Sequence, residues 1–422
     1  MNRLPKSLIA LRHRNYRLLW IGLLISMSGS LMRNAAILWH VSLLAPDDQK
    51  ALALGLVGLV RVAPMVIFSF ISGVVADAVD RRRLMLFTNT AMLLVSATLA
   101  VVTFSGLDRL WLVYGLAALG AAIGSFDAPA RQSLFPNLVP REHLPNAISL
   151  NSIMFQTASV IGPAAGGLII GAAGVAWAYA FDAASFVALL ATLRQMRGVP
   201  PRAPGERSEI SLRAAWQGLR FVFSRPLIRS TMLLDFFANF FASAMLLLPI
   251  FAQDILRVGA QGYGLLAAAP AIGALLTSLA MVPLVERIVA RGRVLVAAVA
   301  VYGLATVLFG FSATFWLTFL CLFAIGAADM VSTVLRNIIR QLTTPDGLRG
   351  RMTSVNMIFF MGGPQLGELE AGLVAQAFGP VVSVVSGGLA CLAATAWIAW
   401  KTPALLAYRK EPAPALHLQA AD

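Results

Sequence analysis

Charged residues are scarce in this chain: only 12% of its 422 residues are Asp, Glu, Lys or Arg, whereas a soluble domain carries about 25%. Hydrophobic residues make up 59% of the sequence, and the mean hydropathy is +0.78. A soluble core of this length cannot bury so many apolar side chains. The composition therefore excludes a soluble enzyme, a disordered chain and a fibrous protein, and it indicates an integral membrane protein.

Cysteine and histidine are also rare, with two and four residues. Cys321 and Cys391 both fall in apolar runs, and the histidines are scattered. Their spacing matches neither a metal site nor a disulfide framework, and the sequence has no phosphate-binding loop for ATP. We therefore expect no metal, no other cofactor and an energy source other than nucleotide hydrolysis.

Acidic residues are the minority among the charges, with 19 Asp and Glu against 33 Lys and Arg and a formal net charge of +14. The basic residues form short clusters between apolar stretches, a pattern typical of cytoplasmic loops in membrane proteins. We interpret the excess as positive-inside topology. The expected partner is the lipid bilayer, and no nucleic acid is expected.

Apolar segments long enough to cross a bilayer, about 20 residues, occur twelve times in the sequence. An even number of spans puts both termini on one side, and the arginine clusters identify that side as cytoplasmic. We expect a multi-pass protein of a bacterial-type inner membrane with both termini cytoplasmic. The predicted spans are 18–44, 51–76, 84–105, 110–130, 146–172, 175–195, 228–253, 262–285, 293–313, 315–341, 352–378 and 380–400.

The middle of the chain divides the spans into two sets of six. Residues 199–205 are Pro-rich, and residues 208–223 carry apolar side chains at helical spacing, as in a helix at a membrane interface. We expect bundles over 1–195 and 228–422, joined by a cytoplasmic linker over 196–227. The two halves also share residues at a constant spacing of 205, which predicts six-helix bundles related by a pseudo-two-fold axis. The repeated residues are Arg131/Arg336, Pro140/Pro345, Ser149/Ser354, Asn151/Asn356, Phe155/Phe360, Gly162/Gly367, Gly167/Gly372 and Leu168/Leu373.

A motif of glycine, aspartate and two arginines follows the second span: Gly73, Asp77, Arg81 and Arg82. Glycine lets helices approach closely, and an aspartate can bind the positive end of a neighbouring helix or an arginine. Such residues could form a latch that holds one conformation and opens in the other. An ordinary positive-inside loop explains the arginines but not Gly73 and Asp77, so we predict a gating motif.

Span 5 contains a proline between glycines, in the order Gly162, Pro163, Gly166 and Gly167. A proline flanked by glycines gives a helix that bends and has a flat face. Two interpretations stay open, a functional hinge and close packing of small residues, and we favour the hinge.

These two motifs resemble those of the major facilitator superfamily, the second being similar to the antiporter motif of drug–proton exchangers. Residues 126–136 and 348–352 narrow the resemblance to the branch that includes the enterobactin exporter and related macrolide and multidrug efflux proteins. The resemblance covers nearly all of residues 10–400 and implies the major facilitator fold, alternating access and export driven by the proton-motive force. Four positions depart from the family pattern: Ala78, Asp80, Ala158 in place of the antiporter motif's leading glycine, and Leu116 in place of the arginine that many drug–proton antiporters carry in span 4.

Ionisable residues inside the spans are the candidates for coupling, because each costs about 2.5–3.5 kcal/mol to insert and needs a partner or a wet cavity. Arg61 in span 2 lies at a depth similar to that of Glu368 and Glu370 in span 11. The resembled fold brings these spans together, so we predict an ion pair between Arg61 and one of the two glutamates. The pair would either carry a proton or hold the halves together as a static bridge, and both readings stay open.

The predicted cavity and substrate residues are Arg33, Asp235, Asn239 and Asp329, on spans that line the central cavity in the resembled fold. Arg33 would meet an anionic substrate group or Asp329. Asp235 lies nearer the cytoplasmic end and would be a residue of a wet vestibule. Asp182, in a peripheral span, is expected to make a structural hydrogen bond.

The predicted function is therefore secondary active transport, with proton-coupled efflux of a siderophore or a drug-like molecule. The expected partners are the small-molecule substrate, protons and the lipid bilayer, and we expect a monomer. A nutrient importer of the same fold is the main alternative. A membrane-embedded enzyme is disfavoured because the sequence lacks a nucleophile motif and matched catalytic residues.

Overall fold

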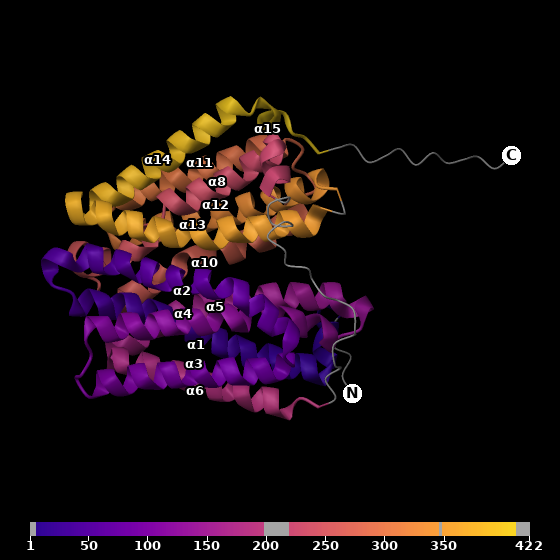
Figure 1. The fold of residues 1–422 in the computed structure, drawn as a ribbon. Helices are drawn as coiled ribbons and strands as arrows, with labels where there is room; N and C mark the ends of the chain where they lie inside the picture. The colour runs from indigo at the N-terminus through magenta and orange to yellow at the C-terminus, as the bar shows by residue number, and fades with distance from the viewer. Residues whose placement is uncertain (1–5, 198–218, 346–347, 411–422) are drawn as a thin grey trace.

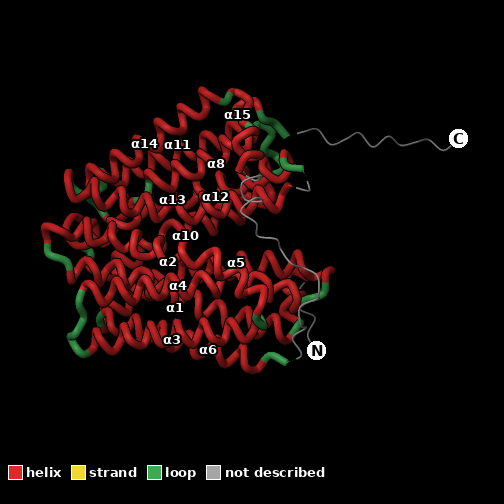
Figure 2. The backbone as a smooth tube through the Cα atoms, viewed as in Figure 1, coloured by secondary structure: helices red, strands yellow, loops and turns green. Residues whose placement is uncertain are grey.

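The structure, a computed structural model, describes residues 6–197, 219–345 and 348–410. These ranges consist of helices and connecting loops and contain no strand, as Figure 2 shows. The predicted all-α fold is confirmed. Eleven helical segments of the described residues are long and apolar enough to cross a membrane, and a twelfth helix of 30 residues covers the remaining predicted span.

Among residues 6–197, six long helices form the N-terminal bundle, preceded by the short helix η1 (Lys6–Arg12). Helix α1 packs on α5 and α6, α3 packs on α4 and α6, and α2 packs on α4. The helices are α1 (Arg14–Leu44), α2 (Lys50–Ala78), α3 (Arg81–Phe104), α4 (Leu110–Leu134), α5 (Leu144–Ala173) and α6 (Val175–Gln195).

The C-terminal bundle, built from the described residues after 219, repeats this plan. Helix α12 packs on α10 and α11, α11 packs on α14, and α13 packs on α8. The long helices are α8 (Pro226–Phe241), α10 (Gly259–Leu284), α11 (Arg291–Gly310), α12 (Phe315–Thr343), α13 (Arg349–Phe378) and α14 (Pro380–Lys401), followed by the short α15 (Pro403–Ala407).

The two bundles lie one above the other in Figure 1 and meet through two helix pairs, α2 with α13 and α5 with α10. Helices η1 and α15 lie at the same end of the molecule, which we call the terminal end. The opposite end, which holds the start of α2 and the end of α13, is called the far end.

The predicted span 228–253 coincides with the apolar segment Pro226–Ile255, but its helix is interrupted. Helix α8 stops at Phe241, and the chain continues through η5 (Ala244–Leu247), α9 (Leu248–Ile250) and the π-helical turn η6 (Phe251–Ile255). Pro249 lacks an N–H for a bond to the preceding turn, which disfavours a continuous helix. The apolar run is unbroken here, so hydropathy alone does not register the interruption.

The predicted linker and interfacial helix lie largely outside the described residues. Residues 198–218 are not described, and the chain is helical again from 219 to 224. The other span boundaries agree with the helices to within a few residues, because Gly, Pro and charged residues mark where the apolar runs end.

Candidate functional site

Two glycine contacts bring the bundles together. In α2 and α13, a Cβ on Gly55 would lie 2.9 Å from Cα of Gly372. In α5 and α10, a Cβ on Gly167 would lie 2.5 Å from Cα of Gly264. Only glycine allows backbones to approach this closely. These contacts place the predicted glycine Gly167 at the interface between the bundles.

The other predicted hinge residues face two different neighbours. A Cβ on Gly162 would lie 2.7 Å from the carbonyl oxygen of Ser28 in α1, and one on Gly166 would contact Met32 of α1. Pro163 sits inside α5, and its carbonyl oxygen approaches Gly264 of α10. The small residues therefore serve close packing on two faces of α5, and their action as a hinge stays a prediction.

Arg61 and Glu368 lie at matching depth on the two sides of the α2–α13 contact. Arg61 is 11 residues from the far-end start of α2 and Glu368 is 10 residues from the far-end terminus of α13, about 15–16 Å in each case. The Glu368 side chain covers Gly58, one turn from Arg61, where a Cβ would lie 2.8 Å from its Oε2. The charges of Arg61 and Glu368 interact electrostatically.

No direct hydrogen bond joins these two side chains, both of which belong to the described part of the chain. Nη2 of Arg61 and Oε2 of Glu368 are each buried and lack a hydrogen-bond partner. A buried polar atom without a partner is costly, so such atoms are candidates for binding a proton, water or a ligand. Glu370 lies on another side of α13, with no contact to Arg61 among those described.

Arg33 forms an ion pair inside the N-terminal bundle. Its Nη1 lies 3.1 Å from Oδ2 of Asp182, and the Ser96 hydroxyl donates to the same Oδ2 at 2.6 Å. Both charged side chains are buried between α1, α3 and α6. The structure therefore does not bring Arg33 to Asp329. The structural hydrogen bond expected of Asp182 is present, donated by Ser96 of α3, and an ion pair with Arg33 accompanies it.

Asp235 is buried in a second ion pair, within the C-terminal bundle. Its Oδ1 lies 3.0 Å from Nη2 of Arg336, and the two side chains are 3% and 2% exposed. Asn239 donates to Asp235 Oδ1 at 3.0 Å, and Arg340 lies 3.9 Å from its Oδ2. The prediction of a wet vestibule residue is wrong, because the α12 arginine covers this carboxylate.

Asp329 shares Arg336 with Asp235 but is accessible. Its Oδ1 lies 3.5 Å from Nη2 of Arg336, and its side chain is 43% exposed. Nε and Nη1 of Arg336 are buried without hydrogen-bond partners. Of the predicted cavity residues, Asp329 is thus an open carboxylate, whereas Arg33 and Asp235 are occupied by partners within their own bundles.

Sequence reasoning missed Arg336 and Arg340 as charges inside the membrane. Arg336 appeared only as the repeat partner of Arg131, although it lies seven residues inside the end of α12. Asp235 lies nine residues inside the start of α8 at the same end. The similar depth of Arg336 and Asp235 in their helices is the sequence signal that could have predicted this ion pair.

The interruption after α8 lies close to α13 at the depth of Glu368. A Cβ on Gly367 would collide with the carbonyl oxygen of Phe240, and the Ser243 hydroxyl donates to the carbonyl oxygen of Pro364 at 3.2 Å. Interrupted helices that expose backbone groups at mid-depth are a recurrent feature of transporter binding sites. Half-buried rings on α8 stack in i, i+4 pairs beside it, Phe236 on Phe240 and Phe237 on Phe241.

The loop between α2 and α3 is tied down by its arginines. Arg81 donates to the carbonyl oxygen of Ser133 at the end of α4, and Arg82 donates to those of Leu193 and Arg194 at the end of α6. Cations at helix C-termini are stabilising. The structure does not describe the surroundings of Gly73 or the side chain of Asp77. The gating motif therefore stays a prediction.

Polar contacts also join the bundles near the far end. Gln253 donates to the Ser42 hydroxyl at 2.6 Å, and the Tyr263 hydroxyl donates to the carbonyl oxygen of Ala35 at 3.0 Å. Lys50 lies 3.7 Å from Asp254. Gln376 of α13 accepts from the backbone N–H of Leu52 and donates to the carbonyl oxygen of Asp48. These contacts hold the far ends of the bundles together.

The sequence matches the family described as transmembrane secretion effector over residues 6–420. It is 27% identical over 322 residues to the enterobactin exporter EntS of Escherichia coli O1:K1, with 76% of each chain covered. It is 29% identical over 325 residues to EntS of Salmonella choleraesuis, with 77% of each chain covered.

Solved transporter structures share the fold. A bacterial homologue of the lysosomal transporter Spinster, in an inward-facing unoccupied conformation, has a TM-score of 0.73 at 15% identity and covers 95% of this chain and 99% of its own. An inward-facing bacterial homologue of the iron transporter ferroportin has a TM-score of 0.67 at 16% identity, covering 90% and 98%.

Proposed function

The chain belongs to the transmembrane secretion effector family of the major facilitator superfamily, and from this premise we propose that it exports a small molecule in exchange for protons. The observation that carries the proposal is the pair of buried, unpartnered groups on Arg61 and Glu368 between the bundles. A site at mid-depth between two repeats is where secondary transporters bind substrate and coupling ion.

The terminal end is the cytoplasmic end. The loop residues Arg81, Arg82 and Arg83 lie there, beside the cluster at the start of α1, and basic loops favour the cytoplasmic side. The membrane is a bacterial inner membrane, which the similarity to enterobactin exporters of Escherichia coli and Salmonella supports.

In the conformation described here the far ends of the bundles are in contact. The Gln376 and Lys50 contacts hold them together. Alternating access requires this end to open and the terminal end to close.

Glu368 is the group that couples transport to protons. A buried carboxylate without a hydrogen-bond donor can bind a proton or a donor group of the substrate, but not both at once. This competition is what an antiporter needs. Arg61 stabilises the ionised carboxylate from α2, so protonation weakens the attraction between α2 and α13 and favours rearrangement of the bundles.

The substrate is a siderophore or a drug-like molecule with an aromatic part. The stacked rings of Phe236 and Phe240 beside the interrupted α8 offer apolar, aromatic contact at the depth of Glu368. The similarity to enterobactin exporters supports the siderophore class and outward direction.

Transport into inverted membrane vesicles tests the proposal. With enterobactin and ethidium as parallel probes, we expect accumulation that depends on an acidic vesicle interior and collapses with a protonophore. Accumulation unaffected by the protonophore would contradict proton coupling. Accumulation of a probe inside right-side-out vesicles would support a nutrient importer instead.

Two glutamates on the same helix provide a matched pair of variants for the same assay. Glu368→Gln should lower gradient-driven transport about tenfold or more, which corresponds to about 1.4 kcal/mol. Glu370→Gln should change it less than about twofold, because that carboxylate has no described contact with α2. Equal losses in the two variants would remove the assignment to Glu368.

A double-mutant cycle then tests the partnership with Arg61. Arg61→Ala and Glu368→Ala should show losses that are strongly non-additive, as groups acting together do. The cycle of Arg61→Ala with Glu370→Ala should be additive. Additive losses in both cycles would contradict the pairing while leaving transport itself in place.

A further inference from the structure

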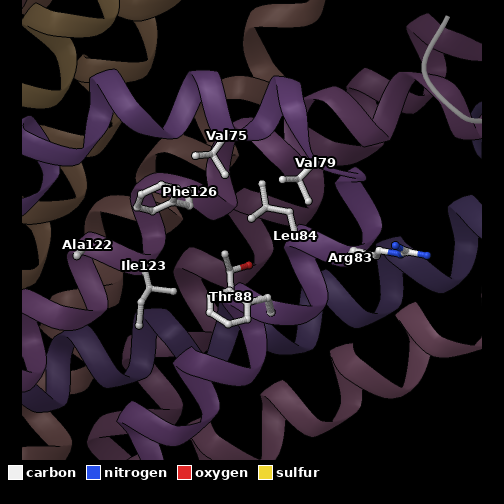
Figure 3. Close-up of a pocket in the computed structure, with 9 residues that line it drawn as sticks. Val75, Val79, Arg83, Leu84, Thr88, Ala122, Ile123 and Phe126 are labelled. Atoms are coloured by element: carbon white, nitrogen blue, oxygen red, sulfur yellow. The ribbon is translucent and has the colours of Figure 1, made fainter.

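A crevice of about 500 Å³ opens between α2, α3 and α4 on the side of the N-terminal bundle, away from the candidate coupling site. We call it the α2–α3–α4 crevice, and Figure 3 shows its side chains around a common space. Its lining residues are Val75 and Val79 of α2 and its C-cap, Arg83, Leu84, Phe87 and Thr88 of α3, and Ala122, Ile123 and Phe126 of α4.

The crevice is lined by apolar side chains apart from Arg83 and Thr88, and the Thr88 hydroxyl already has a hydrogen-bond partner. The Thr88 hydroxyl donates to Asp127 of α4 at 2.9 Å. Phe87 is 74% exposed at the edge of the crevice. An exposed aromatic ring on a helix that crosses a membrane contacts lipid, so the crevice opens to the bilayer rather than to water.

The depth of the crevice matches one leaflet. Arg83 stands in the first turn of α3, and the α4 residues Ala122–Phe126 lie 8–12 residues from the terminal-end limit of α4, or about 12–18 Å. One leaflet contributes about half of a hydrocarbon core of about 30 Å. An acyl chain standing along the crevice would therefore have its headgroup at the level of Arg83.

Arg83 is the member of the arginine run whose guanidinium is available. Arg81 and Arg82 bind carbonyl oxygens at the ends of α4 and α6. The Arg83 side chain is exposed and has no hydrogen-bond partner among the described residues, and it points away from the apolar lining in Figure 3. Asp80 is the nearby acid, and its carboxylate caps α3 by accepting from the Arg83 backbone N–H at 2.8 Å.

We propose that the α2–α3–α4 crevice binds an anionic phospholipid of the leaflet at the terminal end, with an acyl chain in the crevice and the phosphate on Arg83. The apolar lining supplies the contact for the chain, and the guanidinium supplies a charge-assisted bond to phosphate. The neighbouring arginines keep the local potential positive, which attracts anionic headgroups. The bound lipid would contact the helix ends that carry the gating motif.

Lipid retention by the purified full-length chain tests this proposal. The protein, extracted from membranes and exposed to equal phosphatidylglycerol and phosphatidylcholine, is examined by native mass spectrometry for one tightly retained lipid. We expect phosphatidylglycerol to be retained preferentially. Arg83→Gln should lower its retention about fivefold, the contribution of one basic side chain at an anionic surface, and Arg83→Lys should largely restore it.

A further variant tests binding of the acyl chain, and a second serves as a control for binding of the headgroup. Ala122→Phe fills the floor of the crevice and should displace phosphatidylglycerol although Arg83 is intact. Arg293→Gln removes an exposed arginine in the first turn of α11, and should leave retention unchanged. Each variant is first compared with the original chain by thermal unfolding in detergent, so that a loss of fold is recognised.

Unchanged retention in both Arg83→Gln and Ala122→Phe would overturn the proposal. Displacement of the retained lipid by enterobactin or ethidium would overturn it as well, because the crevice would then be a substrate entrance. The measurement does not involve transport, so its outcome is independent of whether the protein exports those probes.

Discussion

At the scale of single residues, the membrane interior of this protein contains two kinds of charge. Arg33 with Asp182, and Arg336 with Asp235, are buried ion pairs inside one bundle, with the opposite charges 3.1 Å and 3.0 Å apart. Glu368 instead lies between bundles with an unpartnered oxygen. A paired charge is structural, whereas an unpartnered one is available for binding.

Breaking the Arg33–Asp182 pair should destabilise the N-terminal bundle. Asp182→Asn leaves a buried arginine without its counter-charge, and loss of one partner from a buried pair costs about 3–5 kcal/mol. Thermal unfolding in detergent measures the effect. Asp254→Asn, which breaks an exposed interbundle pair with Lys50, should cost less than about 1 kcal/mol. Equal losses of stability in Asp182→Asn and Asp254→Asn would show that burial of the ion pair does not increase its contribution to stability.

Residue depth could be predicted from the sequence, but residue direction could not. Counting along each helix placed Arg61 and Glu368 at the same depth, and the structure brings them to facing sides of one contact. The resembled fold assigned Arg33 to the central cavity, but the rotation of α1 about its own axis directs it toward Asp182 instead. Rotation is set by packing of all six helices together, which periodicity in a uniformly apolar helix does not reveal.

At the scale of elements, helix contacts depend on a few glycines. The α5–α10 contact brings Cα of Gly264 to 2.5 Å from where a Cβ of Gly167 would stand. The span limits were predictable because composition changes where a helix leaves the bilayer. The interruption of α8 was not, since its apolar run continues through Pro249 and into η6.

Gly264→Ala should separate α5 from α10. The added methyl group collides with the facing backbone, and overpacking of this kind costs about 1–3 kcal/mol. Gly115→Ala is the control: its Cβ would meet no atom within 4 Å, and alanine favours a helix by up to about 1 kcal/mol over glycine. Thermal unfolding should therefore shift in opposite directions in the two variants. A shift in the same direction would contradict the close contact.

At the scale of the whole molecule, the described polar contacts between the two bundles lie near the far end. The contacts of Gln253 with Ser42 and of Gln376 with the start of α2 are short and polar. Hydrogen bonds of this kind can be replaced by bonds to water at little cost, so they can keep the far ends together and still break when the bundles move. The bundle plan followed from the sequence repeat, but which end is closed did not, because the arginine clusters indicate the side of the membrane and not how the two bundles pack against each other.

Linking the bundles at the far end should arrest transport. Lys50→Cys with Asp254→Cys places two thiols where a described ion pair joins the bundles, at side chains that are 17% and 49% exposed, and a short bifunctional thiol reagent can bridge them. The native residues Cys321 and Cys391 are buried and compete little for the reagent. Each single variant treated with the same reagent should still transport in the vesicle assay. Full transport by the bridged protein would exclude opening of this end during the cycle.

The two glycine contacts also define the mechanics of the molecule. Gly55 with Gly372 and Gly167 with Gly264 are two points at which the backbones of the two bundles approach each other closely. Two fixed points determine a line, and a body held at both retains a single freedom, rotation about that line. Rotation that widens the space on one side of the line narrows it on the other by the same angle. In the proposed alternating-access cycle, opening one end and closing the other would then be one movement, and no continuous pore would form while both contacts persist.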